Sequence, residues 1–193
     1  MLGVFALTWL AVFVPFAHLV AFANDLGHRG VSASLVLSAI GVGGVIGRFA
    51  AGPFSDWAGR RCTLGVALAL QVAAFVAFAA SHGLLLVYLG AVVFGASYGG
   101  GVTVFPALAS DYFGRQSAGA IVGAIFAVAG SVAAIGPIVA AALYDATRSY
   151  RLAFILCAAV NLVALIMVGR LHAPSRAPGR AVAPGGAEAV AGR

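Results

Sequence analysis

The chain has 193 residues, of which 63% are hydrophobic and only 8% are charged, and its mean hydropathy is +1.08. Water-soluble domains carry about 25% charged residues, so this composition excludes an ordinary soluble fold. The net charge of +6 comes from 11 arginines and no lysine, and because these are scattered rather than gathered in one patch, nucleic acid is not an expected partner.

Six apolar segments follow one another, and each is long enough to cross a hydrocarbon core about 30 Å thick as a helix. They lack the alternating polarity of barrel strands, so we predict an all-α membrane protein with six transmembrane helices in a lipid bilayer. The expected spans within a bundle over residues 1–171 are 4–24, 32–52, 62–81, 84–110, 118–143 and 150–171. Residues 172–193 are rich in Ala, Pro, Gly and Arg and predict a disordered tail.

The first span contains His18, a titratable side chain inside an apolar segment. Histidine side chains titrate near pH 6.5 in water, so His18 is a candidate for binding a proton or a small ligand within the membrane. The alternative is a neutral histidine that hydrogen-bonds to a neighbouring helix.

The second span contains Arg48, about five residues from the expected end of its helix, or roughly 7 Å along the axis. A centrally placed arginine costs about 2.5–3.5 kcal/mol on insertion scales, which favours a functional role such as binding an anion. The alternative is a side chain that extends to the lipid headgroups.

A polar connection between the second and third spans carries five residues in a fixed register. They are Gly52, Asp56, Gly59, Arg60 and Arg61. A carboxylate at this place can cap a neighbouring helix and pair with arginine. The alternative is an ordinary connection whose arginines only fix the orientation of the helices in the membrane.

The second and fourth spans are rich in glycine. The pairs Gly43–Gly47 and Gly95–Gly99 have the small-x-x-x-small spacing that allows helices to approach closely in lipid. Tyr98 lies beside the second of these pairs and is a candidate to line a cavity, although a single tyrosine more often serves packing.

The distribution of arginine predicts the orientation of the bundle. With both termini in the cytoplasm, seven arginines fall inside and three outside, as the positive-inside rule requires. Three of the seven lie in the predicted tail, at positions 176, 180 and 193. We therefore expect a multi-pass protein of the cell (inner) membrane.

The spacing Gly-x-x-x-Asp-x-x-Gly-Arg-Arg over residues 52–61 resembles the signature of the major facilitator superfamily. The segments 95–100, 106–114, 135–137 and 144–150 resemble the carboxyl-terminal six helices of this superfamily. Among its branches, the segment 14–20 and the Gly-Arg at 47–48 resemble the monocarboxylate transporters and the oxalate/formate antiporters. The resemblance covers about residues 4–171. It implies half of a twelve-helix fold that carries small organic anions by alternating access.

The resemblance also implies roles for individual residues. Asp56 and its neighbours in the signature would gate the alternating cycle, with the start of the fifth span, near Ser117, as the target of Asp56. Arg48 would bind the substrate carboxylate. His18, with a coupled proton, and Tyr98 are further candidates for the substrate site. Two departures leave the substrate subclass open: Gly44 stands where monocarboxylate transporters have a proton-coupling aspartate, and the chain lacks the lysine that oxalate/formate antiporters use.

The partners expected from this family are a small organic anion and either a missing amino-terminal six-helix half or a second copy of the chain. The alternative is a truncated, non-transporting membrane fragment or a helical partner subunit. The sequence contains no nucleophile–base pair, metal-ligand spacing or phosphate-binding loop, so we expect no enzymatic activity, cofactor or metal.

Overall fold

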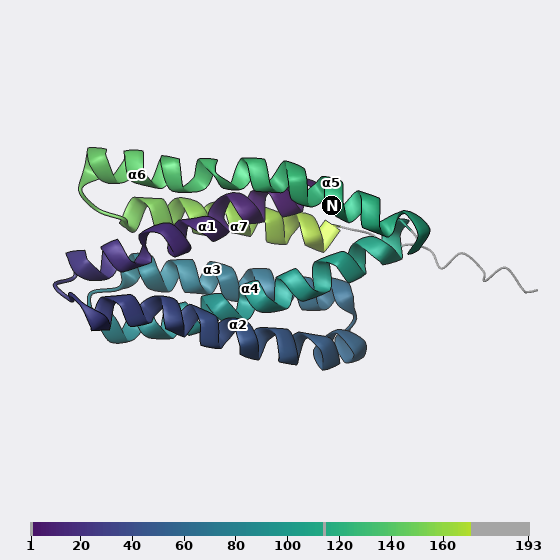
Figure 1. Ribbon diagram of the computed structural model, residues 1–193, viewed down its shortest axis with the longest axis horizontal. Coiled ribbons are helices and arrows are strands. Elements are labelled where there is room, and N and C mark those ends of the chain that lie inside the picture. The colour runs from purple at the N-terminus through teal and green to yellow at the C-terminus, as the bar shows by residue number, and fades with distance from the viewer. Residues whose placement is uncertain (1, 114, 171–193) are drawn as a thin grey trace, which may run out of the picture.

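The computed structural model describes residues 2–113 and 115–170, and this part of the chain is built from helices (Figure 1). They are α1 (Leu2–Asp25), α2 (Val31–Ala58), α3 (Arg60–Ala80), α4 (Leu84–Phe113), α5 (Arg115–Ala133), α6 (Ile135–Thr147) and α7 (Arg151–Arg170). Because α5 and α6 together make one span, six segments are long and apolar enough to cross a membrane. The predicted all-α fold with six transmembrane helices is confirmed. The expected tail, 172–193, lies outside the described residues.

The helices run back and forth between two ends of an elongated bundle (Figure 1). One end holds the start of α1, the α2–α3 connection, the end of α4 and the end of α7; we call it the arginine end because Arg60 and Arg61 lie there. In the bundle, α1 and α7 lie between the span formed by α5 and α6 and the group formed by α2, α3 and α4. The helix α1 contributes to both buried apolar clusters, one around Phe78 and Phe154 and the other around Phe105 and Val168.

Glycines bring α2 and α4 into backbone contact. A Cβ atom added to Gly43 would lie 2.1 Å from the Val92 carbonyl oxygen, and one added to Gly47 would lie 2.0 Å from that of Ala96. From the α4 side, a Cβ atom added to Gly95 would lie 2.1 Å from the Ile40 carbonyl oxygen, and one added to Gly99 would lie 2.2 Å from that of Gly44. The predicted close approach of the two glycine pairs is confirmed, because no larger side chain fits between these helices without a shift.

The second helix is longer than the sequence indicated. The second span was expected to end near Gly52, where the polar connection that carries Asp56 begins. Instead α2 includes Pro53 and runs to Ala58, where Gly59 breaks it with φ of 85° and ψ of 149°. The positive φ is a conformation that glycine adopts readily and other residues rarely do, so Gly59 makes the sharp connection into α3.

The fifth span is interrupted at Ala134, between α5 and α6. Pro137 follows the break by three residues, and because proline has no N–H it cannot donate to the carbonyl four residues earlier. At the same place Gly136 lies against α1, where an added Cβ would be 1.8 Å from the Leu10 carbonyl oxygen. The glycine thus allows the backbone of α6 to pack directly against α1.

Candidate functional site

Arg60 joins the start of α3 to the end of α4. Its Nη1 atom donates to Asp111 Oδ1 at 2.5 Å and to the Ala107 carbonyl oxygen at 2.9 Å. Both side chains of the ion pair are partly exposed, at 39% and 47%, so water weakens their attraction. The pair is therefore a contact that can form and break at low energetic cost.

Arg61 joins α3 to the last turn of α7. Its Nε donates to the Val168 carbonyl oxygen at 3.1 Å, and its Nη2 donates to the carbonyl oxygen of Gly169. The last carbonyls of a helix have no partner within the helix and carry partial negative charge, so a guanidinium is a favourable cap there. Two consecutive arginines thus attach the start of α3 to two different helix ends.

Asp56 makes neither of these contacts. It lies in the last turn of α2 with an exposed side chain, and within the described residues it forms no hydrogen bond or ion pair. It does not cap α3, whose first turn has no side-chain cap. The expected target near Ser117 falls where side chains are not described. Gly52 has open space around it, since an added Cβ would meet no atom within 4 Å.

Sequence reasoning missed Asp111, the carboxylate that pairs with Arg60. It was placed in the connection between two spans and given no role, whereas the helix α4 continues through it to Phe113. A signal was present: Asp56 and Asp111 are the only acidic residues that the described part of the chain places at the arginine end. Matching the acidic residues at that end to its arginines would have narrowed the partners of Arg60 to Asp56 and Asp111, without choosing between them.

Arg48 lies on the exposed surface of α2, beside the glycine stripe that contacts α4. Its side chain is exposed, as are those of Ile46 and Phe49. Ten residues, or about 15 Å along the axis, separate it from the end of α2 at Ala58. Within the described residues Arg48 forms no hydrogen bond or ion pair, so the bundle leaves its charge uncompensated.

His18 binds the backbone of α6 at the interruption of the fifth span. Its Nε2 lies 3.0 Å from the Pro137 carbonyl oxygen, and because a carbonyl only accepts, Nε2 carries the hydrogen. The His18 ring also lies 5.3 Å from that of Tyr150. Burial, and secondly the negative charge of Asp25, raises the pKa of Tyr150. The hydrogen-bonded histidine that the sequence left as an alternative is thus present.

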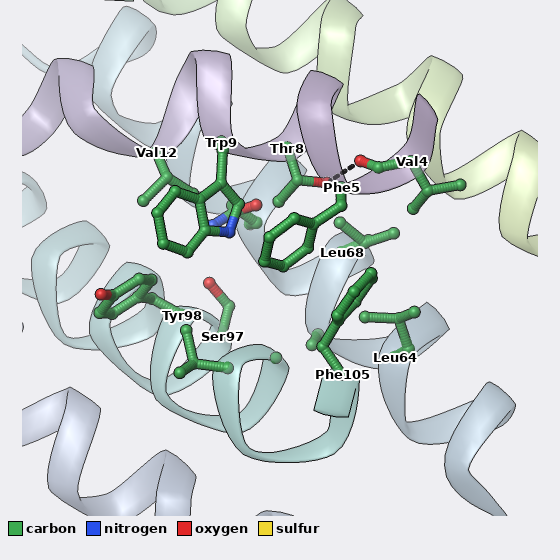
Figure 2. A pocket seen from close by; sticks show the side chains of 14 residues that line it. Val4, Phe5, Thr8, Trp9, Val12, Leu64, Leu68, Ser97, Tyr98 and Phe105 are labelled. Carbon is green, nitrogen blue, oxygen red and sulfur yellow. Dashed lines mark hydrogen bonds between the residues drawn. The ribbon is translucent and has the colours of Figure 1, made fainter. Parts of the chain in front are cut away.

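Tyr98 packs on the aromatic side of α1. Its ring meets that of Phe16 edge-on at 5.4 Å, and it lines a small cavity between α1, α3 and α4 (Figure 2). The three substrate-site candidates have separate surroundings: Tyr98 faces α1, His18 is bonded to α6, and Arg48 is exposed on α2. Within the described residues no group of three His, Cys, Asp or Glu side chains could hold a metal ion.

The geometry defines a class of protein: a six-helix membrane bundle with glycine-packed helices and an arginine-linked end. The family model of the Major Facilitator Superfamily matches residues 1–191. The chain is therefore a member of this superfamily.

The similar curated proteins are monocarboxylate transporters. The chain is 29% identical over 154 residues to monocarboxylate transporter 4 of Gallus gallus, an alignment that covers 76% of this chain and 32% of the relative. It is 26% identical over 161 residues to monocarboxylate transporter 12 of Rattus norvegicus, covering 80% of this chain and 32% of the relative. Monocarboxylate transporter 12 of Homo sapiens is 25% identical, and the alignment covers 80% of this chain and 31% of the relative.

The aligned part is therefore about a third of each relative's length. All three names denote transporters rather than enzymes, which supports the expectation that the chain has no enzymatic activity.

Proposed function

We propose that the chain is the carboxyl-terminal half of a secondary transporter that carries small organic anions across a cell membrane by alternating access. The missing amino-terminal half, or a second copy of the chain, would supply the other wall of the transport path. Membership of the superfamily and the likeness to monocarboxylate transporters support this proposal. Monocarboxylates, with oxalate and formate, are the proposed substrates, moved by symport or antiport.

The observation that carries the proposal is the uncompensated charge of Arg48. The bundle offers this guanidinium no counter-charge within the described residues, although it stands in a helix of membrane-spanning length. Such a charge is costly in lipid, and arginine binds a carboxylate through two parallel hydrogen bonds. A substrate carboxylate that reaches Arg48 from the side of the missing half would compensate it.

The arginine end is the proposed gate. Arg60 and Arg61 attach α3 to α4 and α7, while Asp56 remains available for a partner. In the proposed cycle Asp56 binds across to the start of α5 in one conformation and releases it in the other. Because the Arg60–Asp111 pair is partly exposed, it can re-form after each movement at low cost.

The arginine end faces the cytoplasm in this proposal, with both termini on that side of the inner membrane. The positive-inside rule supports this orientation. His18 would bind a coupled proton at Nδ1, since its Nε2 hydrogen is already donated to the Pro137 carbonyl oxygen.

Uptake in reconstituted vesicles tests the proposal. The chain is reconstituted together with a six-helix amino-terminal half, and entry of labelled lactate, formate and oxalate is measured against lactamide, which has the size of lactate but no carboxylate. Saturable entry of at least one carboxylate without entry of lactamide is the expected result. Equal rates for lactate and lactamide, or rates that match vesicles without the chain, would contradict anion transport.

A further inference from the structure

A small cavity lies between α1, α3 and α4, apart from Arg48 and from the arginine end (Figure 2). Its volume is about 30 Å³, which exceeds the roughly 10–15 Å³ that one water molecule needs. Most of its lining is apolar, but α1 contributes Thr8 and Trp9, α3 contributes Gln71, and α4 contributes Ser97 and Tyr98. The space is too small for an organic anion and suits a ligand of one heavy atom.

Gln71, which lines this cavity, has an unpaired hydrogen-bond acceptor. The residue is only 2% exposed, and its Oε1 atom is buried without a hydrogen-bond partner. An acceptor removed from water and left unpaired is costly, and buried polar side chains are normally satisfied by protein or by ordered water. The cavity beside Gln71 therefore requires a hydrogen-bond donor.

The hydroxyl groups of Thr8 and Ser97 have already donated their hydrogens. Thr8 Oγ1 donates its single hydrogen to the Val4 carbonyl oxygen at 2.8 Å, and Ser97 Oγ donates to that of Phe94 at 2.7 Å. Each hydroxyl oxygen keeps lone pairs that can accept. Together with Gln71 Oε1, these two hydroxyl oxygens are acceptors in a lining that is otherwise mostly apolar, and the indole N–H of Trp9 is a donor among the lining groups.

We propose that this cavity is a binding site for one internal water molecule. The water donates one hydrogen to Gln71 Oε1 and the other to the hydroxyl oxygen of Ser97 or Thr8, and its own oxygen accepts from Trp9. A metal cation is a poorer occupant, because no carboxylate lines the cavity and hard cations collect several oxygen ligands. The water links α3 to α1 and to the turn of α4 that carries Tyr98, across a contact that is otherwise apolar.

Hydroxyl-radical footprinting by X-ray pulse tests the site, because a bound water generates the radical beside its neighbours. The protein is placed in nanodiscs in ¹⁸O-labelled water, and oxidation of Trp9 is measured by mass spectrometry. Trp57, the other tryptophan of the chain, is 81% exposed and serves as the internal reference. Gln71→Met keeps a side chain of similar length but removes the acceptor. We expect a several-fold lower ratio of Trp9 to Trp57 oxidation in this variant than in the wild type.

Two further variants keep the proposal testable if Gln71→Met does not fold. Thr8→Val and Ser97→Ala each remove one acceptor, and at least one of them should lower Trp9 oxidation relative to Trp57. An unmodified Trp9 in the wild type, or a ratio unchanged in all variants that fold, would overturn the water site. Thermal unfolding in sodium chloride and in choline chloride gives a second readout, and equal midpoints are expected. A sodium-dependent rise that Gln71→Met abolishes would overturn the water in favour of a cation.

Discussion

The substitution Gly47→Ala tests the packing that holds α2 against α4. The new Cβ would lie 2.0 Å from the Ala96 carbonyl oxygen, whereas real Cβ contacts stay beyond 3.0 Å, so the backbones must separate by at least the difference, 1.0 Å. Overpacking of this kind costs about 1–3 kcal/mol. The shift also affects Gly43, Gly95 and Gly99, because they belong to the same interface.

Gly41→Ala is the matched control. Gly41 lies in the same helix, but an added Cβ there meets no atom within 4 Å. Both substitutions gain the same helix propensity, about 0.8–1.0 kcal/mol, so the comparison isolates the steric cost. At about 2–4 °C per kcal/mol for a chain of this size, we expect Gly47→Ala to melt roughly 2–12 °C below Gly41→Ala.

Scanning fluorimetry of both purified variants in one detergent measures this difference. A Gly47→Ala midpoint equal to or above that of Gly41→Ala would refute the close approach of the two helices.

Three further predictions concern charged and titratable residues. Asp111→Asn should lower the free energy of unfolding by less than about 1 kcal/mol, because the Arg60–Asp111 pair is partly exposed, yet it should slow uptake; a large drop in the melting midpoint would show that the pair is structural. Asp56→Asn should impair uptake at normal membrane abundance, since it removes an exposed charge; wild-type rates would end its gating role. His18→Ala should flatten the pH dependence of uptake between about pH 5.5 and 7.5, where histidine titrates, and an unchanged profile would leave His18 with only its bond to Pro137.

The sequence was sufficient for the parts of the fold that depend on local composition. Apolar length alone indicates the six spans, because the bilayer sets one thickness for all of them. The glycine pairs of α2 and α4 were predictable for a similar reason: in lipid, small residues four apart mark a surface where helices approach closely. The structure adds the partner of each glycine.

Contacts between distant parts of the chain were beyond the sequence. Arg60 is 51 residues from Asp111, and Arg61 is 107 residues from Val168, so no local pattern reveals either contact. The second span was expected to end where the polar connection begins, whereas α2 continues through Pro53 to Ala58, since proline is tolerated within membrane helices whose neighbours satisfy the freed backbone groups. His18 was left undecided because its partner is a backbone carbonyl 119 residues away, in another span.

The proposed role of Arg48 makes a direct comparison of two variants decisive. In vesicles that contain the chain and its amino-terminal half, uptake of a labelled carboxylate is measured for Arg48→Lys and Arg48→Ala at matched protein levels. We expect Arg48→Ala to abolish saturable uptake, and Arg48→Lys to restore it only in part, since lysine keeps the charge but lacks the planar fork that binds a carboxylate with two hydrogen bonds. If Arg48 only extends to the lipid headgroups, lysine should replace it with little loss of uptake. Full uptake in Arg48→Lys together with substantial uptake in Arg48→Ala would contradict the account.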